Sequence, residues 1–128
     1  MKTIFIILTF ALSLIACSSG NSDGSGTVQT DDKVKDIFIV SSGTNHWIDE
    51  NVIYDLTVTG SNDIVLIKGN NELRKLAIVG SNNMFTISDN VTIEQINATG
   101  SDNTLSVPVG SGFAFHSNTG SGNQIIEQ

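Results

Sequence analysis

A four-residue turn motif recurs at a strict spacing of 20 residues between positions 60 and 123 of this sequence. The copies are Gly60-Ser61-Asn62-Asp63, Gly80-Ser81-Asn82-Asn83, Gly100-Ser101-Asp102-Asn103 and Gly120-Ser121-Gly122-Asn123. Self-similarity at a fixed period of about 20 residues or more, as here, is typical of solenoids and other repeat arrays. This spacing constrains the fold more strongly than any other feature of the chain.

Apolar residues alternate within each repeat unit, and the same positions stay apolar from one unit to the next. The predicted inward columns are Ile53, Leu73, Ile93, Phe113; Leu56, Leu76, Ile96; Val58, Ile78, Ala98; Val65, Phe85, Leu105, Ile125; and Ile67, Ile87, Val107. Alternation with a period of two indicates half-buried strands, and a glycine in every unit would break an amphipathic helix. Equivalent strands one coil apart pair in parallel, and such connections are right-handed by default.

The sequence therefore predicts an all-β protein, a short parallel β-solenoid (β-helix) with two or three sheets. We expect about 20 residues per coil, roughly four and a half coils and a right-handed winding. An irregular first coil is predicted over residues 37–48, offset by about three residues from the later ones, because terminal repeats are commonly atypical. The last coil ends at Gln128 with no obvious cap, so its open strand edges could pair with an envelope protein or a second copy.

Residues 1–16 are predicted to be an export signal. Lys2 is followed by an apolar stretch, Ile4 to Leu14, which is too short for the roughly 20 residues that span a bilayer. The sequence Leu14-Ile15-Ala16-Cys17 resembles the lipobox of bacterial lipoproteins. That resemblance implies cleavage before Cys17 and attachment of lipid to its thiol and amino group. An ordinary secretory signal is the alternative.

Lipidation would also account for Cys17 being the only cysteine, which cannot form an intrachain disulfide. Residues 17–32 contain one large apolar side chain, Val28, and are predicted to form a tether with a reach of about 20 Å. The repeat domain is expected to occupy residues 33–128. Ser18, directly after Cys17, resembles the sorting pattern for the outer membrane and would favour that location in a cell with two membranes.

Charge argues against nucleic acid and anionic lipid as partners. Removing residues 1–16 takes away Lys2 and leaves 5 basic against 13 acidic residues, a net charge of −8. The lipid on Cys17, and not electrostatic attraction, is expected to hold the protein at the membrane.

The last turn position, Asp63, Asn83, Asn103 and Asn123, could form either a structural ladder or a calcium-binding rim. We favour the ladder, with Gly60, Gly80, Gly100 and Gly120 as its partner turn positions. We call these four last-position residues the rungs of the ladder. Most of them carry neutral amides, whereas calcium sites in proteins are rich in carboxylates. We also expect the rungs to adopt the left-handed backbone conformation that asparagine tolerates.

Other candidate chemistry is weaker. The carboxylates Asp49, Glu50, Asp55, Asp89 and Glu94 could serve acid–base chemistry or hold a metal, but solvated surface charge is the simpler interpretation. His46 could pair with His116 in catalysis; alternatively His46 belongs to the first coil and His116 is partly buried in the last. We therefore predict no catalytic residues, no metal site and no cofactor.

Trp47 is interpreted as a lid on the end of the core, and the alternative is a binding platform. Trp47 and Tyr54 are the residues that could stack against a sugar. The predicted outward positions include Thr57, Thr59, Thr99 and Thr119, which resemble an ice-binding face, but Ala77, Val79 and Asn97 interrupt the threonine rows. Lys68, Arg74 and Lys75 form a small basic group that we interpret as solvated.

The turn motif followed by alternating apolar residues resembles an uncharacterised family of bacterial domains found in exported proteins and lipoproteins. The resemblance covers about residues 49–128 and is clearest at 60–63, 80–83 and 100–103, whereas Asp63 and Gly122 depart from the motif. The family has no established activity, so the resemblance implies no catalytic residue. We expect a non-catalytic lipoprotein that acts as a structural or interaction module of the cell envelope. The alternative is a glycan-binding or carbohydrate-active solenoid, and calcium or ice binding is a third possibility.

Overall fold

The computed structural model describes residues 34–70 and 72–128, and all regular secondary structure in them is β-strand. Residues 1–32, with the predicted signal, Cys17 and tether, lie outside the described residues. One sheet consists of β1 (Lys35–Ser42), β3 (Tyr54–Ser61), β5 (Glu72–Val79), β7 (Thr92–Thr99) and β9 (Ser117–Thr119). The other consists of β2 (Asn45–Asp49), β4 (Ile64–Lys68), β6 (Met84–Ile87), β8 (Thr104–Val107) and β10 (Gln124–Glu127).

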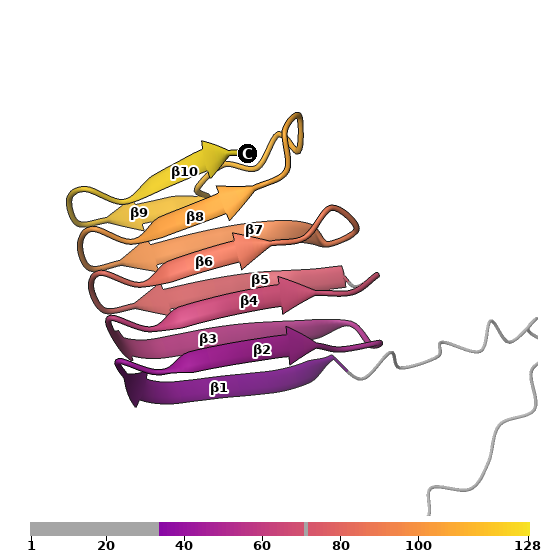
Figure 1. Cartoon of the computed structure of the whole chain (residues 1–128), viewed down its shortest axis with the longest axis horizontal. Coiled ribbons are helices and arrows are strands. Elements are labelled where there is room, and N and C mark those ends of the chain that lie inside the picture. Colours follow the sequence, from indigo (N-terminus) through magenta and orange to yellow (C-terminus); the bar gives the residue numbers. More distant parts are fainter. Residues whose placement is uncertain (1–33, 71) are drawn as a thin grey trace, which may run out of the picture. The chain divides into compact units, whose positions relative to one another are not determined.

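Successive strands alternate between the two sheets, and every pairing between neighbours within a sheet is parallel. The chain therefore winds as a β-solenoid of about five coils, as Figure 1 shows. The prediction of a short all-β solenoid with this repeat length is confirmed, because each strand pairs with its equivalent in the next coil. The number of coils is half a coil larger than predicted, and the number of sheets is two.

The core lies between the two sheets and contains most residues of the predicted columns, together with Ile39, Tyr54 and Val91. The fully buried side chains of its centre come from both sheets and include Leu56, Val58, Val65, Ile67, Leu76, Ile78, Phe85 and Leu105. Neighbouring residues on each strand point outward because side chains alternate across a strand. Removing these apolar side chains from water is the main force that stabilises the stack.

The predicted offset of the first coil is wrong. β1 pairs with β3 so that Ile37 lies opposite Leu56, and β2 pairs with β4 so that Asn45 lies opposite Ile64. The first coil is therefore one residue shorter than the later coils. Gly43 consequently corresponds to Asn62, the third position of the turn, and not to the glycine that begins it.

The extra residue of the later coils enters at a bulge in β5. Tyr54 pairs with Leu73, whereas Asp55 pairs with Lys75, so Arg74 is the inserted residue. As a result Tyr54, and not the predicted Ile53, continues the inward column of Leu73 and is completely buried. A bulge of this kind leaves two residues of one strand opposite one residue of its neighbour.

The turns between β3 and β4, β5 and β6, and β7 and β8 stack on one another at the left of Figure 1. Their third residues, Asn62, Asn82 and Asp102, have the left-handed backbone conformation with φ angles of 61°, 57° and 58°. The prediction that the fourth residue takes this conformation is wrong. Gly122 stands at the third position of the last turn and also has a positive φ, so it suits the turn geometry.

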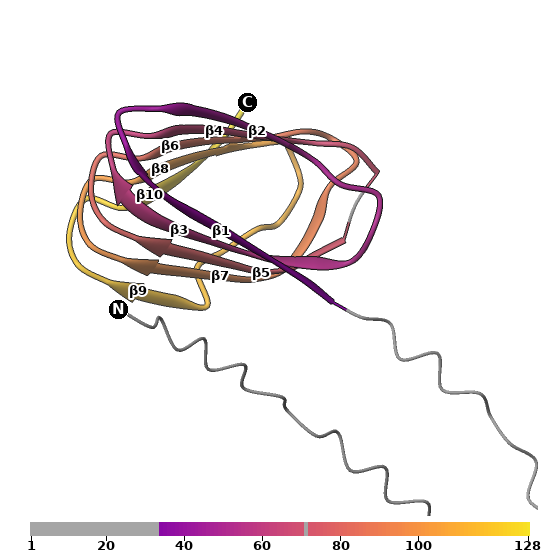
Figure 2. The same cartoon turned by 90° about the horizontal axis from the view of Figure 1, so that it is seen from below.

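The C-terminal end of the core is covered. Residues 112–116, directly before β9, form no strand, and Phe113 and Phe115 in this segment pack against the core. In Figure 2, which looks along the stack, this orange-yellow segment crosses inside the outline of the other coils. The expectation of an end without a cap is therefore wrong.

Candidate functional site

The recurring turns form a hydrogen-bonded ladder that links all five coils. The side-chain Oδ1 of each rung accepts a hydrogen bond from the backbone N–H of the rung one coil earlier, from Thr44 to Asp63 and so on to Asn123, at 3.0–3.1 Å. The side-chain Nδ2 of Asn83, Asn103 and Asn123 donates to the carbonyl oxygen of Gly60, Gly80 and Gly100, at 2.9–3.0 Å.

These contacts leave the ladder little capacity to bind a ligand. Asp63, Asn83 and Asn103 are at most 1% exposed, and their amide or carboxylate groups lie inside the turn stack. A buried polar group normally has its partner within the fold, and here the neighbouring coil supplies it. The turn residues thus hold adjacent coils in register.

Asp63 is the rung that does not fit this pattern. Its Oδ1 accepts hydrogen bonds from the Thr44 backbone N–H and hydroxyl, at 3.0 and 3.2 Å. Its Oδ2 is buried without a hydrogen-bond partner among the described residues. Oδ2 lies 2.7 Å from the point where a Cβ on Gly60 would sit, and the Ser41 carbonyl oxygen is even closer to that point. Two acceptors therefore face each other where the other rungs pair an amide N–H with a carbonyl.

Replacing Asp63 with Asn should stabilise the protein. The new Nδ2 could donate to the Ser41 carbonyl oxygen, as Asn83 donates to Gly60, while Oδ1 keeps its bonds to Thr44. Satisfying a buried polar atom is worth about 1–3 kcal/mol. We expect the midpoint of urea unfolding, followed by circular dichroism at pH 7, to rise without a change in slope. An unchanged or lower midpoint would contradict the assignment of Oδ2 as unsatisfied.

A small polar network extends the ladder to the start of the solenoid. His46 Nε2 lies 2.7 Å from the Thr44 hydroxyl and 2.9 Å from the Ser41 hydroxyl. The Thr44 hydroxyl donates to Asp63, so it is free to accept a hydrogen bond from the imidazole. His46 therefore closes the N-terminal end of the ladder.

The two histidines do not form a pair. His46 is in the first coil, whereas His116 directly precedes β9 in the last coil. The backbone N–H of His116 donates to the carbonyl oxygen of Ile96, so His116 does follow the predicted column. Its side chain is nonetheless exposed, and the prediction that it is partly buried is wrong.

The candidate carboxylates are dispersed, and two of them form ion pairs. Arg74 donates to both carboxylate oxygens of Asp55, at 2.9 and 2.5 Å, and this hydrogen bonding lowers the pKa of Asp55. The Lys35 Nζ lies 2.7 Å from Glu50 Oε2. Within residues 34–70 and 72–128, no three His, Cys, Asp or Glu side chains come close enough together to hold a metal ion.

The two aromatic residues considered for sugar stacking differ in exposure. Tyr54 is fully buried, and burial together with the charges of Glu50 and Asp49 raises the pKa of its hydroxyl to about 12. It cannot stack on a ligand. Trp47 is 70% exposed on the outer face of β2, beside Leu66 in the next coil, so the interpretation of Trp47 as a lid on the core is wrong.

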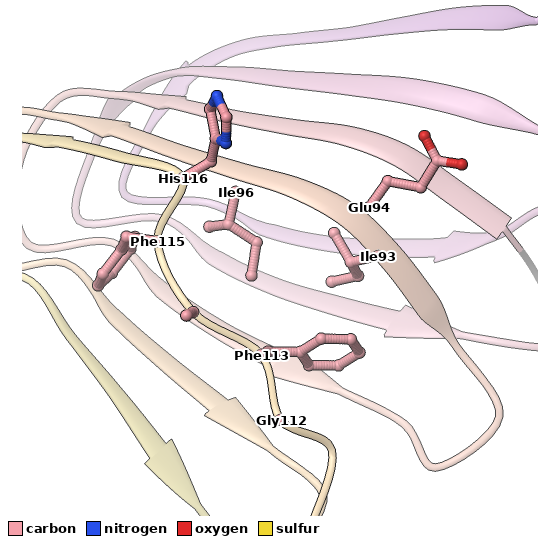
Figure 3. Close-up of a pocket in the computed structure, with 8 residues that line it drawn as sticks. Ile93, Glu94, Ile96, Gly112, Phe113, Phe115 and His116 are labelled. Carbon is pink, nitrogen blue, oxygen red and sulfur yellow. The ribbon is translucent and has the colours of Figure 1, made fainter.

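A hollow of about 350 Å³ lies next to the C-terminal cap, between β7 and residues 112–116. It arises because this segment leaves the path that the other coils follow. In Figure 3 the apolar side chains of Ile93 and Ile96 extend toward Phe113, whereas the Glu94 carboxylate and the His116 ring point to the other side of β7. The lining of the hollow thus combines these apolar side chains with polar atoms, and neither the Glu94 carboxylate nor the His116 ring is directed into it (Figure 3).

Comparison with family models, curated proteins and solved structures gives no match. The resemblance to the envelope repeat family stays a prediction. In the part of the chain that the structure describes, no helix has the length and apolar character needed to cross a bilayer.

Two features of the surface were missed in the sequence. The first is the C-terminal cap, for which the aromatic residues Phe113 and Phe115 at alternate positions were the available signal. The second is a set of exposed apolar side chains on the first coil, Phe38, Val40 and Trp47. The unbroken apolar run Ile37-Phe38-Ile39-Val40 could have indicated that both faces of β1 are apolar.

Proposed function

We propose that this protein is a bacterial lipoprotein that displays a non-catalytic β-solenoid from the cell envelope. The β-solenoid supplies a rigid body with two flat outer faces. The lipobox-like residues 14–17 supply the membrane attachment, through acyl chains on Cys17. More than one acyl chain is required for stable anchoring, because a single chain binds only marginally. In a cell with two membranes, Ser18 favours the outer membrane.

One observation carries the non-catalytic part of this proposal. The polar side chains that recur in every coil are used in holding the coils together, through the ladder from Thr44 to Asn123. The outer faces of the two sheets carry many small, threonine or apolar side chains, together with charged ones such as Asp36 and Lys75. Such surfaces suit contact with another macromolecule or a membrane better than binding of a small substrate. A protein partner or second copy at the C-terminal coil stays a prediction.

Replacing Cys17 with Ser tests the anchoring directly. The hydroxyl cannot accept the thioether-linked lipid, so incorporation of labelled palmitate should be lost and the protein should leave the membrane fraction. Intact mass of the purified protein measures the modification, and fractionation of cells measures the location. Asp63→Asn, which changes the fold domain alone, should keep label and location. A Cys17→Ser protein that stays in the membrane fraction as wild type does would contradict the proposal.

A further inference from the structure

The outer faces of both sheets change in character along the stack. Strand register aligns three outward rows on the first sheet, which read Asp36, Asp55, Lys75, Gln95; Phe38, Thr57, Ala77, Asn97, Ser117; and Val40, Thr59, Val79, Thr99, Thr119. On the second sheet the rows read Asn45, Ile64, Met84, Thr104, Gln124 and Trp47, Leu66, Thr86, Ser106, Ile126. Large apolar side chains gather in the first three coils, and polar ones prevail in the last two.

The most exposed of these side chains belong to the first coil. Phe38 is 70% exposed, Val40 is 80% exposed and Trp47 is 70% exposed. We refer to these three residues as the N-terminal rim. They lie on the outer faces of both sheets, so they flank the first coil on two sides. The side chains of the inward row, Ile37, Ile39 and Ile48, are separate from them and pack on the core.

Folding alone does not account for the N-terminal rim. At the same outward positions of the second coil, Thr57 and Thr59 take the places of Phe38 and Val40. These later positions show that the solenoid forms with polar side chains there. Exposed apolar groups that collect at one end of a protein commonly mark a contact with a partner or a membrane.

The N-terminal rim is also the end of the solenoid closest in sequence to the proposed anchor. Only residues 18–34 separate Cys17 from Lys35, the first residue of β1. The predicted tether would give this number of residues an end-to-end distance of about 20–25 Å. The acyl chains on Cys17 would thus hold the start of the first coil within about that distance of the bilayer.

We propose that the N-terminal rim inserts into the headgroup region of the bilayer in which Cys17 is anchored. This inference rests on the proposed lipidation. Side chains at a membrane interface penetrate about 5–10 Å, and neighbouring coils are about 4.8 Å apart, so contact would be confined to the first one or two coils. Tryptophan is favoured at this depth because its ring is apolar and its N–H can still reach water.

The charged residues of the first coil indicate which kind of lipid the N-terminal rim would contact. Lys35 is paired with Glu50, and the exposed residues Asp36 and Asp49 lie on the strands of the same coil. These carboxylates would repel anionic headgroups. The surface that fits the N-terminal rim is therefore a zwitterionic bilayer, such as phosphatidylcholine or phosphatidylethanolamine.

Trp47 is the only tryptophan of the chain, so its fluorescence reports on this contact without labelling. The lipidated full-length mature protein is reconstituted into phosphatidylcholine vesicles, with and without bromine atoms on the acyl chains. We expect the emission to shift to shorter wavelength than that of the Cys17→Ser protein in buffer, and brominated lipid to reduce it about twofold. The double variant Phe38→Ser, Val40→Ser should lose most of the quenching while remaining on the vesicles.

Val79→Ser is the matched control, because Val79 is an outward valine of the third coil and should not reach the bilayer. Lipidated protein that sediments with the vesicles but shows neither shift nor quenching would overturn the rim contact and leave the anchor intact. A shift that depends on protein concentration without vesicles would overturn it in favour of a second copy. A mass spectrum without lipid on Cys17 would overturn both the anchor and the contact that rests on it.

Discussion

The Gly100→Ala protein should fail to form a stable solenoid. A Cβ on Gly100 would lie 2.8 Å from the carbonyl carbon of Gly80, and still closer to its oxygen, whereas ordinary contacts are 3.4–4 Å. The atoms in the way are backbone atoms of the neighbouring coil, so no side chain can rotate to make room. The clash could be relieved only if the two coils moved apart. That movement would break the hydrogen bonds of the ladder and open the core between the two coils.

We expect a loss of more than about 4 kcal/mol in the free energy of unfolding, a large part of the roughly 5–15 kcal/mol typical of a domain. The measurement is urea unfolding, with the circular dichroism of the sheets as the readout. Gly110→Ala is the control, since Gly110 also has a positive φ, of 75°, but nothing lies within 4 Å of its added Cβ. That change should cost only about 1–2 kcal/mol for the left-handed conformation. Equal losses in the two proteins would contradict the role of close coil approach.

Replacing Asn83 with Asp should produce the second-largest loss. The Asn83 amide donates to the Gly60 carbonyl oxygen at 3.0 Å, and the side chain is 1% exposed. An aspartate would place a second acceptor against that carbonyl, in a site without access to water. Leaving a buried polar group unpaired costs about 1–3 kcal/mol, and more when the group is charged, so we expect a loss of about 3 kcal/mol or more.

The same chemical change at Asn90 provides the control, because Asn90 is exposed in the turn after β6. Asn90→Asp should change the urea midpoint little. Asp63→Asn is a second comparison for Asn83→Asp. Asp63→Asn removes an unsatisfied carboxylate from the ladder, whereas Asn83→Asp introduces one, so the two changes should shift the urea midpoint in opposite directions. If Asn83→Asp were as stable as wild type, the ladder would not hold the coils in register.

Much of the fold could be predicted from the sequence because the repeat imposes the same requirements on every coil. A column such as Leu56, Leu76 and Ile96 must be apolar to fill the space between two sheets, and Gly80 and Gly100 must lack a side chain to let the coils approach. Each requirement is repeated, so the pattern is visible above the variation of single residues.

The irregular parts could not be predicted in this way, because each occurs once. Tyr54 lies beside Ile53, and only the bulge at Arg74 decides which of the two enters the core. Trp47 could cover the core end or face outward, and the choice depends on a first coil one residue shorter than the others. Phe113 matched an inward column, but residues 112–116 form no strand, and this segment crosses the end of the core instead (Figure 2).

The N-terminal rim was harder still to predict than the fold. Phe38 and Val40 alternate with the core residues Ile37 and Ile39, so the run reads as a buried strand. Their exposure becomes evident only when the register places them opposite Thr57 and Thr59 on the outer face. The same register shows that large apolar side chains on the outer faces gather in the first three coils.

The ladder also has a direction, because Asn83 and Asn103 each bind the turn that precedes them and are themselves bound by the turn that follows. The hydrogen bonds of each rung involve only the adjacent coils, so they do not depend on the total number of coils. A gene duplication or deletion of one complete repeat unit would therefore join equivalent rungs and leave every hydrogen bond of the remaining stack in place. The height of such a protein could change during evolution in steps of about 4.8 Å, the separation of adjacent strands, without redesign of either end.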